Sequence, residues 1–412
     1  MKKITLHYGG EKLDVEIPAG ATFHILKPRG GFKPLSTKDL KHKMAEIEKE
    51  LPGEGLTLVV NDQTRPTRTD LILKSGWDYF KGAIERIIVA TGSHSGPEPH
   101  HLKRMLGENL YREVSSRIIS HSAREDPHEE LGRTRRGTVV RVMQEFLASK
   151  YVLYINSVEP HYFAGFTGGR KSILPGVSSY DTIEQNHSHA LDPGAKTLAL
   201  EGNPVHEDMM EAASFVDMPH TSLQLVQSPS GELLDIFWGD IKESFFRAAE
   251  KAKDVFTSPA EGLYDVVIAS VPPPMDLNLY QSQKGIENSK LALKDGGILL
   301  LLSTCREGIG PKEFWDLLTQ EETPGEVLAR IKEGYRLGYH KAAKIAEFVG
   351  RSRLWAVTEM DPDVLKRGFM KGYRGRDGVR RAVKEAIEEV GEGVRVLYVP
   401  DSTVMVPYVE EM

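Results

Sequence analysis

The segment from Glu159 to Ala190, EPHYFAGFTGGRKSILPGVSSYDTIEQNHSHA, concentrates residues that could carry chemistry. Lys171 lies in a glycine-rich stretch, with His161 ten residues before it and His187 sixteen residues after it. Glycines let the backbone approach a ligand closely. A lysine can contact a phosphate or bond covalently to a carbonyl-type cofactor, and histidines act as bases or metal ligands. Folding stability does not require this combination, which therefore predicts a ligand site.

The lysine stretch is close to a P-loop but lacks one of its residues. The P-loop has glycine immediately before the lysine, whereas this chain has Arg170 there. We therefore expect no NTP hydrolysis. Two alternatives stay open on these residues alone: a phosphate-handling enzyme that uses the Gly168–Lys171 loop, and a surface loop whose lysine is solvated.

Composition narrows the class of protein. A chain of 412 residues is too long for one ordinary domain, so we expect two. The net charge of −6 argues against nucleic-acid binding, and no apolar run reaches the length of a membrane span. The beginning of the sequence alternates like a β-hairpin without a signal-peptide pattern. Cys305 is the only cysteine, which excludes a disulfide framework and favours a buried core thiol. A reducing, cytoplasmic location fits.

Short apolar runs alternate with helical patterns along most of the chain, which predicts an α/β fold: two α/β domains with largely parallel sheets and an active-site cleft between them. A polar segment suggests a boundary near residue 258. We expect an N-terminal cofactor-binding and catalytic domain over 1–258 and a C-terminal domain over 259–412 that closes over the substrate, with a C-terminal segment able to cross back. The predicted strands are 56–61, 85–91, 115–120, 150–157, 264–271, 296–303, 353–358 and 394–400, and the predicted helices are 37–51, 69–84, 203–216, 282–295 and 378–391.

Polar side chains follow four successive predicted strands. Asp62, His94, His121 and His161 each come at or just after the end of an apolar run. Ligands of open α/β sheets gather at the carboxyl ends of the strands. Four such residues indicate a site more strongly than any one of them, although polar loops also begin at strand ends.

Two further segments carry candidate binding residues. In NDQTRPTRTD (61–70), Asp62 and Arg65 flank a tight turn that opens a helix, where backbone N–H groups can hold a phosphate and an arginine can hold a carboxylate. An ordinary capped helix start explains this segment equally well. In LNLYQSQKGIENSK (277–290), Gln281 and Lys284 can share one helix face, beside Tyr280.

Together, NDQTRPT, TGSH, PHYFAGFTGGRKSILPG, the later histidine at 187 and LYQSQK resemble the nickel-dependent lactate racemase family in order and spacing over most of the chain. The resemblance implies an isomerase that racemises or epimerises a 2-hydroxy acid. It also implies the nickel-pincer nucleotide as cofactor (pyridinium-3,5-bisthiocarboxylic acid mononucleotide with nickel) and cofactor-biosynthesis proteins as partners.

The resemblance assigns roles to individual residues. Lys171 carries the covalently attached cofactor, His187 ligates nickel, and His94 and His161 are the catalytic acid–bases. The turn of Asp62, Gln63, Thr64 and Arg65 lies against the cofactor, and the substrate's carboxylate region is held by Arg65, Tyr280, Gln281 and Lys284.

The chemistry of a 2-hydroxy acid agrees with these roles. Removing the Cα proton is hard beside a carboxylate, whereas removing hydride leaves a stable 2-keto acid. The hydroxyl proton must leave at the same time, and histidine is a suitable base near neutral pH. A non-catalytic carrier of the nucleotide remains the alternative. Ser95, Ser122 and the segment GYHKAAKI (338–345) depart from the residues expected of lactate-acting relatives, so we expect that a larger or more polar acid can be the substrate.

Overall fold

The computed structural model describes residues 2–409. The chain forms two compact units. One spans residues 30–255, and the other combines the described residues up to 29 with those from 256 onward. The sequence-based boundary at 258 lies beside this division, but the prediction assigned the first 29 residues to the N-terminal domain. Residues 2–29 belong to the other unit because β3 (Thr22–Ile25) pairs in parallel with β19 (Arg395–Val399), and the β1–β2 hairpin buries its apolar face in the same core.

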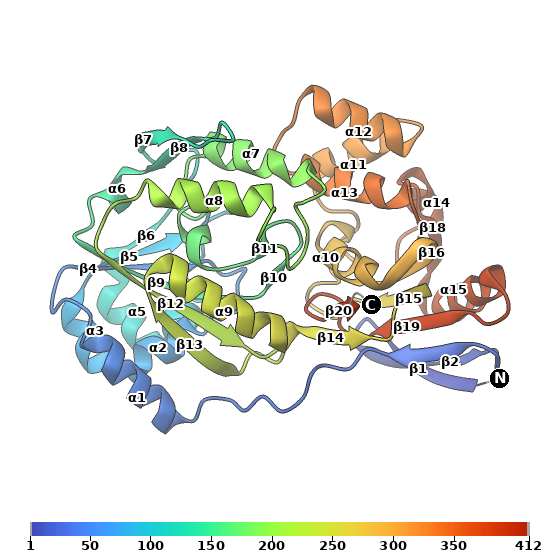
Figure 1. Ribbon diagram of the computed structural model, residues 1–412, viewed down its shortest axis with the longest axis horizontal. Coiled ribbons are helices and arrows are strands. Elements are labelled where there is room, and N and C mark those ends of the chain that lie inside the picture. Colours follow the sequence, from blue (N-terminus) through green and yellow to red (C-terminus); the bar gives the residue numbers. More distant parts are fainter. Residues whose placement is uncertain (1, 410–412) are drawn as a thin grey trace. The chain divides into compact units, whose positions relative to one another are not determined.

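The unit of residues 30–255 is built on a six-stranded sheet with the order β13-β12-β9-β4-β5-β6 (Figure 1). Its neighbouring strands run parallel except for β12 and β13, which are antiparallel. The strands are β4 (Leu56–Asn61), β5 (Ile84–Ala90), β6 (Ile118–Ser120), β9 (Tyr151–Ser157), β12 (His220–Gln227) and β13 (Leu233–Gly239).

The central strands of this sheet are continuous apolar runs because helices cover the sheet. All of Leu56–Val60 in β4 is buried, as expected of a parallel strand that is enclosed on both faces. One core cluster joins the strands to the first five helices. The helices are α1 (Thr37–Glu48), α2 (Thr69–Ser75), α3 (Trp77–Ala83), α4 (Pro99–Leu106), α5 (Glu108–Val114), α6 (Gln144–Leu147), α7 (Tyr180–Ser188), α8 (Pro204–Ser214) and α9 (Ile241–Phe256).

Short elements between β9 and α7 shape the chemically interesting loop. The two-residue strands β10 (Pro160–His161) and β11 (Gly165–Phe166) pair with each other, and the 3₁₀ turn η2 (Gly169–Ser172) carries the candidate lysine. A second hairpin, β7 (His128–Arg133) and β8 (Val139–Met143), lies earlier in the chain.

The other unit contains a fully parallel sheet of six strands with the order β18-β17-β16-β15-β19-β3. Small two-stranded sheets, β1–β2 and β14–β20, accompany it. Its strands are β1 (Lys2–Tyr8), β2 (Glu11–Ile17), β3, β14 (Thr257–Ala260), β15 (Tyr264–Ser270), β16 (Leu293–Leu302), β17 (Arg353–Thr358), β18 (Lys371–Arg374), β19 and β20 (Val406–Val409). Its helices are α10 (Leu279–Ser289), α11 (Lys312–Thr319), α12 (Pro324–Glu333), α13 (Tyr339–Val349), α14 (Pro362–Arg367) and α15 (Gly375–Val390).

The structure confirms the predicted α/β class with parallel sheets, and each of the eight predicted strands is present within a few residues. One predicted helix, 69–84, is two helices because Gly76 ends α2 and begins α3. Cys305 is buried at 1% exposure, as predicted. In the described part of the chain, no helix has the length and apolar character of a membrane span.

Candidate functional site

The four polar strand-end residues follow strands that are neighbours in one sheet. Strands β9, β4, β5 and β6 lie side by side and run parallel, so their carboxyl ends share one edge. Asp62 follows β4, His94 follows β5, His121 follows β6, and His161 lies four residues after β9. The sheet thus supplies residues from distant parts of the sequence to one edge.

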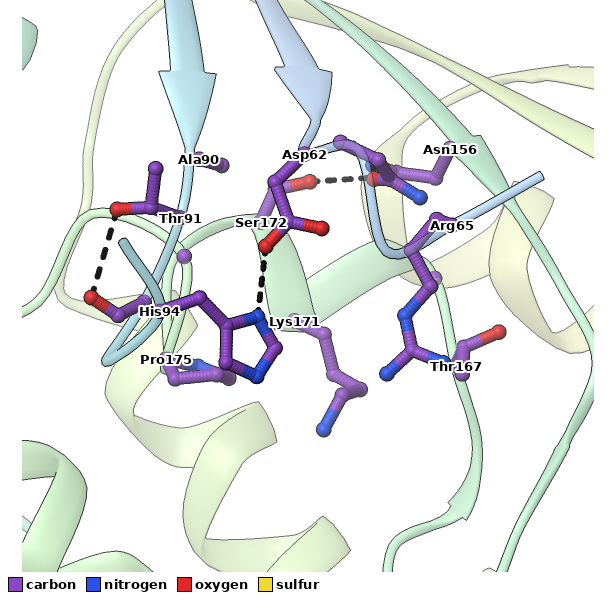
Figure 2. A pocket seen from close by; sticks show the side chains of 14 residues that line it. Asp62, Arg65, Ala90, Thr91, His94, Asn156, Thr167, Lys171, Ser172 and Pro175 are labelled. Carbon is purple, nitrogen blue, oxygen red and sulfur yellow. Dashed lines mark hydrogen bonds and ion pairs between the residues drawn. The ribbon is translucent and has the colours of Figure 1, made fainter. Parts of the chain in front are cut away.

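Asp62 and His94 form a hydrogen-bonded pair (Figure 2). His94 Nδ1 lies 2.7 Å from Asp62 Oδ2. Asp62 is buried at 4% exposure, whereas the His94 side chain is half exposed. Burial raises the pKa of Asp62, but the hydrogen bond and charge of His94 and the bond from Thr64 outweigh it, so the pKa lies below its ordinary value. An ionised Asp62 accepts the Nδ1 proton, which leaves His94 Nε2 as the basic atom.

The turn after Asp62 is held by its own side chains. The Thr64 N–H and hydroxyl donate to Asp62 Oδ1 at 3.0 and 2.6 Å. Arg65 Nη1 donates to Glu159 Oε1 at 3.1 Å, with both side chains mostly buried. Gln63 Nε2 donates to the carbonyl of Ser95 at 3.2 Å, which ties this turn to the His94 loop.

Glycines in the lysine loop are required by its packing. Gly168 and Gly169 have φ angles of +85° and +52°, a region that favours glycine. A Cβ at Gly169 would lie 2.8 Å from Cβ of Phe245, and one at Gly168 would lie 2.7 Å from Oε1 of Gln224. Gln224 also accepts the Gly169 N–H at 2.9 Å. The loop therefore has one tightly fixed path, and this path sets the position of Lys171.

Lys171 lines a cavity of about 60 Å³. The cavity wall also contains Asp62, Arg65 and His94, so it joins the ends of β4 and β5 to the lysine loop (Figure 2). Burial, and then the charges of Arg170 and Arg65, hold the pKa of Lys171 well below its ordinary value. An amine whose pKa is depressed in this way is a candidate nucleophile.

His161 and His187 are connected to Lys171 through Phe163. The ring centroid of Phe163 lies 4.5 Å from that of His161 and 5.1 Å from that of His187, and Lys171 Nζ lies 5.6 Å from it. Both histidines are buried, at 9% and 8% exposure. The backbone N–H of Ala164 donates to His161 Nδ1 at 3.3 Å. In its neutral form, His161 therefore carries its proton on Nε2, the reverse of His94.

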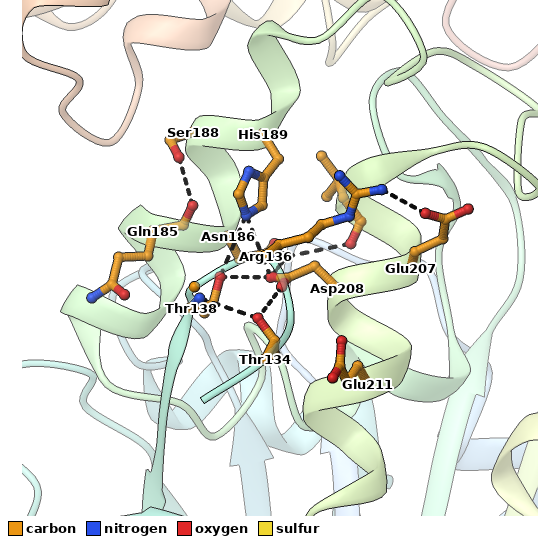
Figure 3. Close-up of polar contacts among 12 residues, drawn as sticks. Thr134, Arg136, Thr138, Gln185, Asn186, Ser188, His189, Glu207, Asp208 and Glu211 are labelled. Carbon is orange, nitrogen blue, oxygen red and sulfur yellow. Dashed lines mark hydrogen bonds and ion pairs between the residues drawn. The ribbon is translucent and has the colours of Figure 1, made fainter. Parts of the chain in front are cut away.

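A buried carboxylate fixes the helix that carries His187 (Figure 3). Asp208 on α8 is fully buried. Its Oδ2 accepts from Asn186 Nδ2 at 2.8 Å and from the Thr138 hydroxyl at 2.8 Å, and its Oδ1 accepts from the Thr134 hydroxyl. Asn186 precedes His187 on α7, so these bonds tie the histidine's helix to α8 and to the β7–β8 hairpin.

His121 pairs with another histidine. Its Nε2 lies 3.3 Å from Nε2 of His128, and the hydroxyl of Thr91 donates to its carbonyl at 2.6 Å. Burial lowers the pKa of His121 to about 4. Protonating both rings would direct two N–H groups at each other, so His121 is uncharged at neutral pH.

The remaining predicted site residues lie in the other unit. Tyr280 and Gln281 lie in the first turn of α10, and Lys284 lies in the middle of the helix; Asn278 caps the helix by accepting the Gln281 N–H at 2.9 Å. Lys341 Nζ donates to the Tyr280 carbonyl at 2.6 Å and lies 3.7 Å from the centroid of the Tyr280 ring. Burial, and then the charge of Lys284, lower the pKa of Lys341 to about 7.

The structure thus groups the predicted residues in three sets. The cavity joins Asp62, Arg65, His94 and Lys171. Phe163 joins His161 and His187 to Lys171, and α10 carries the third set. Sequence reasoning missed Phe163, Asp208 and Lys341. The position of Phe163 between His161 and Lys171 in the sequence could have indicated that it belongs to the site. Asp208 and Lys341 could not be found in this way, because the residues that they contact are distant in the sequence.

The residues present fit a cofactor that attaches to an amine. In the cavity, the described residues place no hydrogen-bond acceptor or carboxylate on Lys171 Nζ. Within residues 2–409, no cluster of three or more histidine, cysteine, aspartate or glutamate side chains has the arrangement of a metal site. His187 would hold a metal as a single imidazole ligand.

Known proteins match the chain along most of its length. Residues 8–198 match the family profile of the lactate racemase N-terminal domain, and residues 261–406 match that of the lactate racemase C-terminal domain. A lactate racemase from Thermoanaerobacterium thermosaccharolyticum is 29% identical over 354 residues, which cover 80% of this chain and 81% of the relative. A lactate racemase from Lactiplantibacillus plantarum is 26% identical over 359 residues, which cover 84% and 83%.

Solved structures agree with these sequence matches. The lactate racemase apoprotein from Thermoanaerobacterium thermosaccharolyticum superposes with a TM-score of 0.86 at 25% identity, covering all of both chains. A crystal structure of a protein from Thermotoga maritima shares the fold, with a TM-score of 0.71 at 15% identity over 92% of this chain and 100% of the other. The chain therefore belongs to the lactate racemase family.

Proposed function

We propose that this protein is an isomerase that racemises or epimerises a 2-hydroxy acid, lactate or a larger relative, with a nickel-pincer nucleotide attached at Lys171. The observation that supports this most is the cavity in which the Lys171 amine and the hydrogen-bonded Asp62–His94 pair share one wall. The family relatives named lactate racemase support the reaction class.

In this proposal, the protein holds the cofactor through three features. Lys171 forms the covalent bond, His187 contributes one imidazole ligand to nickel, and the Asp62–Arg65 turn, with Gln63 and Thr64, contacts the nucleotide. Bound in this way, the cofactor would supply a hydride acceptor for the substrate's Cα. The proposal also includes biosynthesis proteins that deliver the cofactor and a cytoplasmic location.

The two histidines move the hydroxyl proton. His94 presents a basic Nε2 because Asp62 holds its Nδ1 proton. His161 presents a protonated Nε2 because its Nδ1 accepts from Ala164. His94 is therefore set to take a proton. His161 would give one from its imidazolium form, because a neutral imidazole is too weak an acid, and the roles of the two rings exchange for the opposite enantiomer.

Cationic and polar side chains hold the substrate's carboxylate. Arg65 suits a planar anion because its guanidinium can donate two parallel hydrogen bonds. Tyr280, Gln281 and Lys284 are the further binding residues in the proposal. The buried Oε1 of Gln281 has no hydrogen-bond partner in the described chain, which suits an amide that awaits a ligand donor such as a hydroxyl.

The alternative is a non-catalytic carrier of the nucleotide. A carrier needs Lys171 but has no use for two imidazoles of opposite tautomer. The proposed test is racemisation of a panel of 2-hydroxy acids in D₂O by protein co-produced with cofactor-biosynthesis proteins.

We expect inverted product without deuterium at Cα, because hydride leaves and returns without exchange with water. Deuterium at Cα would show proton abstraction and contradict the mechanism. A stoichiometric adduct without racemisation of any acid would favour the carrier.

A further inference from the structure

Arg170 is a buried arginine that pairs with no carboxylate among residues 2–409. Its side chain is 1% exposed and is among the largest fully buried side chains of the protein. In the described part of the chain, its guanidinium donates to two backbone carbonyls, from Nη1 to Gly168 at 3.1 Å and from Nη2 to Ala164 at 2.7 Å. Its Nε is buried without an acceptor among the described residues. Burying an uncompensated charge is costly, so a purely structural role explains this residue poorly.

The Arg170 charge is fixed in place. Its guanidinium stacks 4.3 Å from the ring centroid of Phe245, and the same ring closes off any Cβ at Gly169. Burial lowers the pKa of Arg170 to about 9, which still leaves it protonated at neutral pH. At neutral pH the loop therefore carries a positive charge at the residue that precedes Lys171.

Other charges around Lys171 are already engaged. Asp62 receives bonds from His94 and Thr64, and Arg65 pairs with Glu159. No ion pair within 4 Å joins a described carboxylate to Lys171. Among the described residues, Lys171 has no ion-paired carboxylate, and two cations act on its amine: Arg170, which precedes it in the chain, and Arg65, which pairs with Glu159.

We propose that the buried charge of Arg170, held by the carbonyls of Gly168 and Ala164, makes Lys171 the nucleophile of this site by disfavouring a second positive charge beside it. Arg170 is thus a positioning residue that acts through Lys171. Only an uncharged amine has a lone pair that can bond to an acyl carbon; the group that leaves this carbon takes the electron pair of the broken bond, and the amine releases one proton. The use of this amine for an acyl group of the nucleotide rests on the proposed function.

The test measures the ionisation of Lys171 in the full chain produced without cofactor. Trace acetylation with acetic anhydride, followed by mass spectrometry of peptides, gives the pH midpoint of reactivity for each lysine. Lys171→Arg identifies the peptide. We expect the Lys171 midpoint to lie at least about one pH unit below the mean of the exposed lysines.

Two substitutions separate charge from structure. Arg170→Gln removes the charge and should raise the Lys171 midpoint by about one pH unit or more, whereas Arg170→Lys keeps a charge and should raise it less. Arg117→Gln is the matched control, because Arg117 also donates to a backbone carbonyl, that of Ile84 at 2.7 Å, and should leave the midpoint unchanged.

An unchanged Lys171 midpoint in folded Arg170→Gln, even with a lower melting temperature, would show a structural role and overturn the proposal. If neither Arg170 variant folds, the wild-type protein decides, because a Lys171 midpoint equal to that of the exposed lysines overturns it too. These outcomes do not depend on racemisation, so failure of this inference and failure of the proposed function are distinguishable.

Discussion

Lys171 and Lys341 are two buried lysines in different units, and burial depresses the pKa of both. Their surroundings differ. Lys341 donates to the Tyr280 carbonyl and lies over the Tyr280 ring. Lys171 lines a cavity beside the Asp62–His94 pair and has no hydrogen-bond acceptor among the described residues. The difference teaches that a depressed pKa alone does not mark a reactive lysine; the space and partners around its nitrogen do.

The largest expected difference between the two lysines concerns covalent attachment. Lys171→Ala should abolish the cofactor adduct completely and leave the fold intact, since a lysine at a cavity wall contributes little to the core. Lys341→Met is the matched control and should retain the adduct with a lowered melting temperature. Intact-mass spectrometry of both variants, co-produced with cofactor-biosynthesis proteins, checks this. A stoichiometric adduct in Lys171→Ala would reverse the assignment of the two lysines.

The next effect concerns the histidines that distinguish the Lys171 region. His94→Ala and His161→Ala should each reduce kcat for racemisation by about 10²- to 10⁴-fold, because each turnover uses one ring as base and the other as acid. Asp62→Asn should also reduce kcat, since the amide no longer favours the Nδ1 proton of His94. Cofactor loading, measured by mass, serves as the control. A rate within about threefold of wild type for either histidine variant would remove that residue from the mechanism.

A third effect concerns His121, in the same unit as Lys171. It tests whether burial keeps the imidazole of His121 uncharged, as we expect for the amine of Lys171. His121 has a pKa of about 4 in the fold against an ordinary value of about 6.5. The unfolded chain therefore binds a proton that the folded chain does not, so stability is full above pH 6.5 and is lost as the pH falls towards 4. The loss is about 3 kcal/mol in the free energy of unfolding.

Urea unfolding of wild type and His121→Gln at pH 7 and pH 4.5 measures this loss. The variant should be less pH-sensitive than wild type by most of that amount. Equal pH sensitivity would mean that His121 is already charged in the folded protein.

The smallest expected effect lies on the Lys341 side of the comparison. Lys284→Ala should raise KM for 2-hydroxy acids by about tenfold, the effect of losing one charge-assisted hydrogen bond, while cofactor loading stays normal. Steady-state kinetics over a panel from lactate through malate and longer aliphatic acids to sugar acids also tests whether the residues that differ from those expected of lactate-acting relatives change the preferred substrate. An unchanged KM would exclude Lys284 from substrate binding, and a preference for lactate over every other acid would show that Ser95, Ser122 and GYHKAAKI do not alter specificity.

Much of the unit of residues 30–255 could be predicted from the sequence, because its central strands are continuous apolar runs. Asp62, His94, His121 and His161 follow the carboxyl ends of these strands, as predicted. The strands β12 and β13 were not predicted. In β12, polar residues such as Gln224, which is buried and holds the lysine loop, interrupt the continuous apolar run by which the other strands of this sheet were recognised. The sequence pattern of a strand does not show that Gln224 binds the lysine loop.

Contacts between distant segments account for the rest. Residues 2–29 join the unit that contains β19 through the β3–β19 pairing, and no local sequence pattern indicates this pairing. Asp208 reads as one of several acidic residues on an amphipathic helix, yet it receives hydrogen bonds from Thr134, Thr138 and Asn186. Lys341, whose amine donates to the Tyr280 carbonyl, lies 61 residues from Tyr280 in the sequence.

Peptide mapping of the protein co-produced with cofactor-biosynthesis proteins tests the central claim most directly, when the same sample is assayed for racemisation of 2-hydroxy acids. The account predicts one modification, on the peptide that contains Lys171, with one nickel per chain and with racemase activity that rises with the modified fraction. Racemase activity in a sample whose Lys171 is unmodified, or an adduct on another residue, would contradict it.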